Sequence, residues 1–120
     1  MITKSYDRRQ ASSLIPLLRS LAIEVQERAA EIERLEWLQE ELAKTERAHK
    51  QELAELRAQI ACHKLELRRT RLEIEALGCE VEHKGVLMIR IPSHRRSGRE
   101  AFAWRIDQPN RLTDVADSAA

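Results

Sequence analysis

The sequence predicts a predominantly α-helical α+β fold. We expect a long antiparallel helical hairpin, coiled-coil-like, with a small C-terminal three-stranded antiparallel β-meander packed on the helix ends. Three observations predict this fold. Residues 7–77 contain one proline and no glycine and are rich in residues that favour helices. Apolar residues repeat there in a heptad pattern. After Gly78 the apolar residues alternate as they do in strands.

One apolar seam is expected to hold the hairpin together. Its 3-4 spacing winds helices around each other and does not build a broad core. The seam turns polar at Gln39, Glu46 and His49. We therefore predict a turn near residues 43–50 between helices at Asp7–Ala43 and Glu46–Leu77. The seam residues are Leu18, Leu21, Val25, Ile32, Leu35, Leu42, Leu53, Leu56, Ile60, Leu67, Ile74 and Leu77.

Two other arrangements satisfy the same seam. The heptad phase continues across the polar zone, as one uninterrupted helix requires, and an antiparallel dimer of long helices also fits. The hairpin is preferred because both ends of the helical region carry a second apolar face. In a hairpin these two ends lie side by side, where one small domain can cover them. The second faces contain Leu14, Ile15, Leu17 and Ile23 at the start, and Leu65 and Leu72 at the end.

Helix boundaries are marked by residues that cap or bend helices. Asp7 is a predicted N-cap, and Pro16 is expected to kink the first helix without ending it. Thr45 is expected to cap the second helix. Gly78 stands where a left-handed C-cap is needed.

The meander is predicted over residues 79–106. A turn at Lys84-Gly85 separates the first two strands, Pro92 stops the second, and Pro109-Asn110 follows the third. Residues 107–120 are expected to form a loose tail, and the whole chain, 1–120, to form a single domain. The three predicted strands are Cys79–His83, Val86–Ile91 and Arg99–Ile106.

Short motifs at both ends of the chain resemble one family. They are Tyr6, Ala11, Leu14, Pro16, Leu18 and Arg19 near the start, and Leu77-Gly78, Gly85-Val86, Pro92, Gly98-Arg99 and Trp104-Arg105 later. Together they resemble domain of unknown function 2203, an uncharacterised and mainly bacterial family. The resemblance implies a helical hairpin with a β-unit and supplies no function.

The chain departs from that family at three places. Arg90-Ile91 stand where the family has Asp-Phe before its proline, and Ala103 stands where it has a cysteine before Trp-Arg. Its closing segment has no clear match after Gln108. If the family's polar cluster has a chemical role, the departures imply that this chain has lost it.

Composition narrows the functional classes. Charged residues make up 34% of the chain and the net charge is +1, so no overall preference for nucleic acid or membrane is expected. We find no membrane span, no signal peptide and no disulfide framework, which favours a cytoplasmic protein. Phosphate loops and nucleophile–base pairs are absent too. We therefore expect a non-enzymatic protein with no catalytic residues, no cofactor and no small-molecule substrate.

The candidate ligands for a zinc site are Cys62, His63, Cys79 and His83. All four side chains are of types that bind zinc. Cys62 and His63 are adjacent, however, so on a helix they point about 100° apart and do not converge on one ion. His63 also occupies a seam position, where a packed histidine is the simpler interpretation. No metal site is predicted.

Two functional hypotheses remain. The first is a coiled-coil interaction or scaffold module, self-association included, with Trp37 as a partner-binding residue because it is a lone aromatic on the solvent side of a helix. The second is a small anion- or RNA-binding protein that uses the loop residues Arg95, Arg96 and Arg99. The strand residues Phe102 and Trp104 offer that hypothesis stacking surfaces, although they are expected to be core. The first hypothesis is preferred because the seam itself is visible in the sequence.

Overall fold

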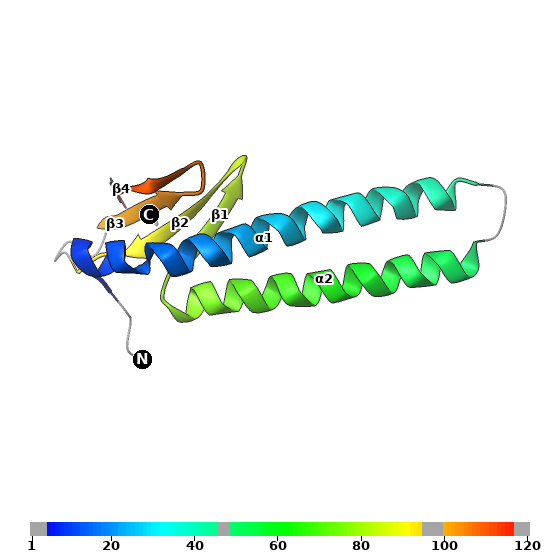
Figure 1. Cartoon of the computed structure of the whole chain (residues 1–120), viewed down its shortest axis with the longest axis horizontal. Helices are drawn as coiled ribbons and strands as arrows, with labels where there is room; N and C mark the ends of the chain where they lie inside the picture. The colour runs from blue at the N-terminus through cyan, green and yellow to red at the C-terminus, as the bar shows by residue number, and fades with distance from the viewer. Residues whose placement is uncertain (1–4, 46–48, 95–99, 117–120) are drawn as a thin grey trace. The chain divides into compact units, whose positions relative to one another are not determined.

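The computed structural model describes residues 5–45, 49–94 and 100–116, which form two helices and a four-stranded antiparallel sheet (Figure 1). The fold is therefore α+β and mainly helical, as predicted. The alternative of one continuous helix is wrong, because the first helix ends at Ala43. The elements are α1 (Arg8–Ala43), α2 (Lys50–Ala76), β1 (Glu80–Lys84), β2 (Val86–Pro92), β3 (Glu100–Arg105) and β4 (Gln108–Ala116).

Helix α1 begins with a reciprocal cap. The Asp7 carboxylate accepts a hydrogen bond from the Gln10 backbone N–H at 2.8 Å, and Gln10 Oε1 accepts one from the Asp7 N–H at 2.9 Å. The predicted N-cap is thus confirmed. Helix α1 continues through Pro16, whose missing N–H leaves one carbonyl on an exposed turn where water can solvate it.

The turn after α1 differs from the prediction. The Thr45 hydroxyl donates to the Leu42 carbonyl at 2.7 Å, so Thr45 closes α1, whereas we predicted that it would cap the next helix. Helix α2 begins at Lys50, and the predicted start at Glu46 lies outside the described residues. At its other end, Gly78 adopts φ +83°, and the Cys79 N–H donates to the Ile74 carbonyl at 3.3 Å. This is the predicted left-handed C-cap.

Two compact units make up the fold. One contains Glu24–Thr70, and we call it the hairpin unit; the other combines Met1–Ile23 with Arg71–Ala120, and we call it the sheet unit. Within the hairpin unit, α1 and α2 run antiparallel and side by side (Figure 1), which is compatible with the predicted hairpin. The predicted seam is buried or half-buried along both helices.

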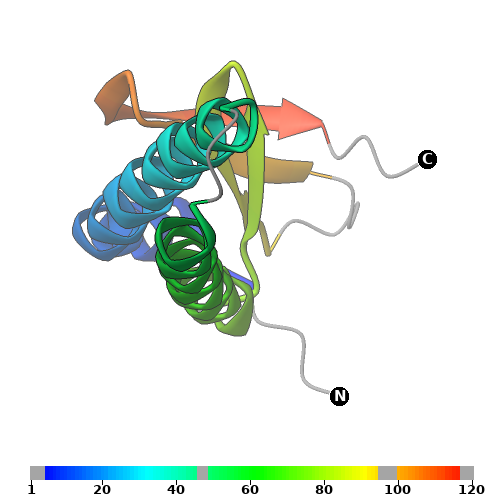
Figure 2. The ribbon, with the colours of Figure 1, turned by 90° about the vertical axis from the view of Figure 1, so that its right-hand side faces the viewer.

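The sheet has four strands where we predicted three. Its order is β1-β2-β3-β4, and every neighbouring pair is antiparallel. Figure 2 shows β4 extended beside β3. Strand β4 occupies most of the predicted tail, 107–120. We expected Pro109-Asn110 to end the sheet, but β4 is an edge strand, where a proline without an N–H is tolerated.

A register shift accommodates that proline. Arg105 pairs with Gln108 and Trp104 pairs with Leu112, so three residues of β4 have no partner on β3. Within this bulge the Pro109 carbonyl accepts a hydrogen bond from the fully buried Trp104 indole at 2.9 Å. The bulge therefore satisfies the only polar group of the largest core side chain.

One face of the sheet forms the core of the sheet unit. Ile89 pairs with Trp104 and Ile91 with Phe102, and all four side chains are buried. The start of α1 is tied to this part of the fold: the Arg8 guanidinium lies 5.9 Å from the centre of the Phe102 ring and donates to the Leu112 carbonyl. The buried line of α1 here runs through Ala11, Leu18 and Ala22.

Candidate functional site

Trp37 projects into solvent from α1 in the hairpin unit. Its exposed fraction, 59%, is the highest among the large hydrophobic residues that the structure describes as exposed. The seam residues Ile32 and Leu35, on the opposite side of the same helix, are buried. The sequence therefore places Trp37 on the outer face correctly, and its partner-binding role stays a prediction.

Other apolar residues of the predicted second faces are only partly covered. Leu17 is 47% exposed, Leu65 50% and Leu72 51%. We expected one small domain to cover both second faces. In the sheet unit, the buried side of α1 is the line of Ala11, Leu18 and Ala22, which leaves Leu17 outside it.

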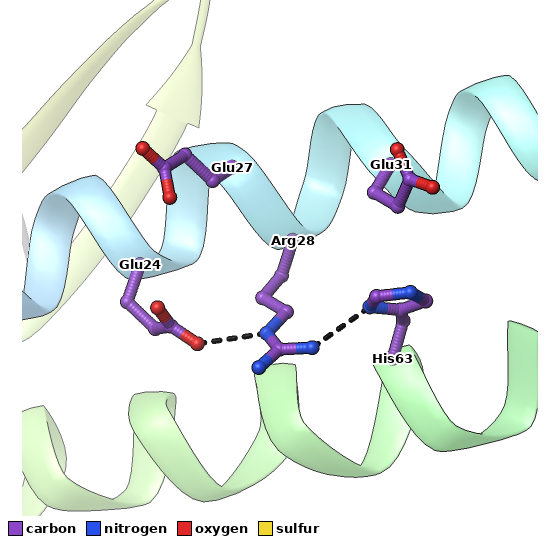
Figure 3. A pocket seen from close by; sticks show the side chains of 5 residues that line it. All are labelled: Glu24, Glu27, Arg28, Glu31 and His63. Carbon is purple, nitrogen blue, oxygen red and sulfur yellow. Dashed lines mark hydrogen bonds and ion pairs between the residues drawn. The ribbon is translucent and has the colours of Figure 1, made fainter. Parts of the chain in front are cut away.

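A polar contact crosses the seam between the two helices (Figure 3). Arg28 of α1 donates from Nη1 to Nδ1 of His63 in α2 at 2.9 Å, and from Nε to the Glu24 carboxylate at 2.7 Å. A guanidinium can only donate, so His63 Nδ1 must be the acceptor. The His63 ring in this arrangement is therefore neutral, with its proton on Nε2.

An open cavity of about 280 Å³ surrounds this contact, lined by Glu24, Glu27, Arg28, Glu31 and His63. The hydrogen bond from Arg28 to Glu24 raises the Arg28 pKa above its usual value. The Glu31 pKa is lowered, chiefly because Arg34 donates to this carboxylate. Arg28 and Glu31, whose pKa values are shifted, each have an opposite charge beside them, so the cavity resembles a solvated ion-pair network more than a catalytic centre.

Arg28 was missed by the sequence analysis, although a signal for it was present. It occupies a heptad position between Val25 and Ile32, where an apolar residue belongs. His63 occupies the corresponding kind of position in the second helix. Polar residues that interrupt the seam in both helices can face each other, and this signal makes Arg28 and His63 a candidate pair.

The zinc candidates fall into different surroundings. Cys62 is exposed while the adjacent His63 is half-buried, as expected for neighbours on a helix. Cys79 is buried in the sheet unit, and burial raises its pKa to about 11. His83 is exposed on β1. Within the described ranges, no group of three or more His, Cys, Asp or Glu side chains could hold a metal ion.

The predicted anion-binding residues Arg95, Arg96 and Arg99 lie outside the described residues. The structure does describe their neighbour His94, whose Nε2 lies 3.1 Å from the Gln10 side-chain oxygen. The stacking surface considered with them is not available, because Phe102 is 3% exposed and Trp104 is fully buried. Both aromatic residues belong to the core, as we expected from the sequence.

A second hollow, of about 300 Å³, lies on the other face of the sheet. It is lined by Glu82, Lys84, Val86, Met88 and Arg105. These residues face away from the core because their strand neighbours, such as Leu87 and Ile89, point inward and are buried. Cationic, anionic and apolar side chains therefore mix on this outer face.

Comparison with known proteins places the chain in a family. The model of the family described as "Uncharacterized conserved protein (DUF2203)" matches residues 4–111. The chain belongs to the DUF2203 family. No curated protein and no solved structure matched it. The predicted resemblance is thereby confirmed, and for DUF2203 the family description names no activity.

Neither helix that the structure describes in this DUF2203 member is long and apolar enough to cross a membrane.

Proposed function

We propose that the chain is a non-enzymatic coiled-coil interaction module that binds a protein partner through the outer face of α1 around Trp37. The observation that carries this proposal is the 59% exposure of Trp37. Burying that side chain against a partner would remove a large apolar area from water, and tryptophan is over-represented among residues that dominate binding energy. The hairpin unit supports the role, because a buried seam keeps the helix that carries Trp37 in place.

The chemistry of the described surface fits an interaction module better than an enzyme. The cavity beside Arg28 contains paired charges, and its histidine is held by an arginine. Cys62 and Cys79 are both free thiols, which suits the reducing conditions of the cytoplasm, where we place the protein.

A tagged pull-down from native extract, treated with nuclease, tests this proposal. The matched variants are Trp37→Ala on α1 and Leu65→Ala on α2, because both remove an exposed apolar side chain from a helix. We expect Trp37→Ala to abolish capture of a specific protein and Leu65→Ala to retain it. Equal capture by both variants would refute a role for Trp37.

A second candidate function is anion or RNA binding. Lys84, which lines the outer sheet hollow, favours it. Arg105 of the same hollow is ion-paired with Asp107, and Glu82 also lines it, so Arg95, Arg96 and Arg99 would have to supply most of the positive charge. Fluorescence anisotropy with a labelled single-stranded RNA tests it at two salt concentrations. Binding that weakens steeply with salt and disappears in an Arg95/Arg96/Arg99 alanine triple variant would support it. Binding that ignores both changes would exclude it.

A further inference from the structure

The outer face of α1 carries a short apolar repeat. Ile23, Ala30 and Trp37 are seven residues apart and all exposed, Ile23 by 38%. Helix α1 is continuous from Arg8 to Ala43, so a spacing of seven residues, about two turns, places the three side chains along one line. This line lies opposite the buried seam. Ala30 stands at its centre, with one large side chain two turns away on each side.

Charged and polar residues flank this line, and all of them are exposed. Helical spacing places one set on each side of the line. One side carries Arg19, Gln26, Glu33 and Glu40, and the other carries Ser20, Glu27, Arg34 and Glu41. Figure 3 shows Glu27 on the side of α1 that is turned away from α2, where a partner helix would meet it.

We propose that the occupant of this face is a second copy of the chain, docked antiparallel so that the two Ala30 residues meet on a two-fold axis. This inference rests on the proposed function, whose partner it names. The small central side chain lets the two helices approach closely. Trp37 of each copy then lies against Ile23 of the other. The dimer contains this contact twice, so the exposed Trp37 and Ile23 of both copies are covered.

Charge complementarity supports this register. An antiparallel two-fold places each flank against the same flank of the second copy, as in antiparallel coiled coils. Glu27 then faces Arg34 of the second copy, and Arg19 faces its Glu40. Symmetry repeats both contacts, which gives four attractive pairs. In the remaining flanking pairs a carboxylate faces a neutral side chain, so no like charges oppose each other.

Other registers and orientations lose this complementarity. Moving the centre by half a heptad, so that Ala30 faces Trp37, sets Arg34 against Arg34 and Glu33 against Glu33 of the second copy. A parallel pair keeps Glu33 against Arg34 but sets Glu40 against Glu41 of the second copy, so its attractive and repulsive pairs are equal in number. Like charges placed opposite each other oppose docking.

Docking α1 onto the α2 face that carries Leu65 would be a heterologous contact. Such a contact does not close in a dimer and can propagate from copy to copy. The α1–α1 contact uses the same face of both copies, so it is complete in a dimer and leaves no α1 face free for a third chain.

Arg34 can form an ion pair with Glu27 of the second copy while it keeps its own hydrogen bond to Glu31. In the chain described, it donates from Nε to Glu31 at 3.0 Å, and its side chain is 58% exposed. A guanidinium has five N–H donors, so some remain for Glu27 of the second copy.

Sedimentation equilibrium of the full chain measures the dissociation constant of the dimer. We expect Arg34→Glu and Glu27→Arg each to raise it by about tenfold or more, because each sets like charges opposite one another twice. The double variant Glu27→Arg/Arg34→Glu should restore the original dissociation constant, because the two charges of each pair exchange places and the attraction is kept. Arg68→Glu, on the exposed face of α2, is the matched control and should leave it unchanged.

Cross-linking tests the register independently of affinity. In a Cys62→Ser background, Ala30→Cys should form an intermolecular disulfide under mild oxidation, because only a residue on the two-fold axis meets its own copy. Ala58→Cys, exposed on α2, is the control and should remain unlinked. Absence of the Ala30→Cys cross-link, or equal cross-linking of the control, overturns the register.

The outcomes separate this inference from the proposed function. A chain that stays monomeric, yet still captures another protein through Trp37, overturns the second copy and leaves the interaction module standing. A dimer whose dissociation constant is unchanged by Trp37→Ala and by the single charge reversals Arg34→Glu and Glu27→Arg overturns the docking face. Assemblies that keep growing with concentration overturn the closed two-fold.

Discussion

Replacing Arg28 and His63 together by leucine is expected to raise the free energy of unfolding by about 1 kcal/mol. Both residues occupy seam positions and are half-buried. A leucine at each would gain about 1 kcal/mol from partial burial. The hydrogen bond lost between Arg28 and His63 contributes about 1 kcal/mol, and the exposed ion pair to Glu24 only a few tenths.

The single substitutions are expected to have little effect. Arg28→Leu and His63→Leu each gain about 1 kcal/mol and each lose the same hydrogen bond, so each gain is cancelled. The double variant loses this bond once. The double-mutant cycle should therefore show a coupling energy of about 1 kcal/mol between the two positions.

Urea denaturation followed by circular dichroism at 222 nm measures all four proteins. The control cycle uses Glu36→Leu and Lys64→Leu, because this ion pair also joins the two helices but is exposed and 3.8 Å long. Its coupling energy should stay below about 0.5 kcal/mol. A coupling energy near zero for Arg28 and His63, or a double variant less stable than both singles, would refute the reasoning.

Three further predictions follow, one from the backbone and two from the cysteines. Gly78→Ala should lower the free energy of unfolding by about 1 kcal/mol, because Gly78 has φ +83°, and Gly78→Asn should cost less; equal denaturation midpoints for all three proteins would contradict this. At pH 8, iodoacetamide should alkylate Cys62 in the native protein and Cys79 only after unfolding, as followed by mass spectrometry. Because burial raises the Cys79 pKa from 9.0 to about 11, its contribution to stability should be complete below pH 9 and be lost as the pH rises towards 11; the loss should be absent in Cys79→Ala.

The helices were predictable because their signals are local and repeated. A heptad seam, an N-cap at Asp7 and a left-handed cap at Gly78 each follow from neighbouring residues, and each is present. Three of the four strands followed from alternation between turn residues. The outward position of Trp37 followed from its place in the heptad.

The features that could not be predicted from the sequence depend on contacts between residues far apart in the chain. Pro109 is normally read as a strand breaker, but the bulge and the edge position of β4 admit it, and its carbonyl serves the Trp104 indole. Arg28 could not be identified from one helix alone, because within α1 it is just one polar residue in the seam. Its significance appears when His63 of the second helix is placed opposite.

The way the sheet unit is assembled from both ends of the chain has a consequence for folding order. Ser5 contacts His94 across 89 positions, and Arg8 reaches Asp114 across 106. On a ribosome, Ser5 and Arg8 cannot make these contacts until His94 and Asp114 have emerged. The hairpin unit is built from one contiguous stretch, Glu24–Thr70. Once this unit has formed, fewer flexible residues separate the two parts of the sheet unit, so less entropy is lost when those parts come together. We therefore expect the helices to form first and the sheet unit to complete folding last, at a rate limited by these distant contacts.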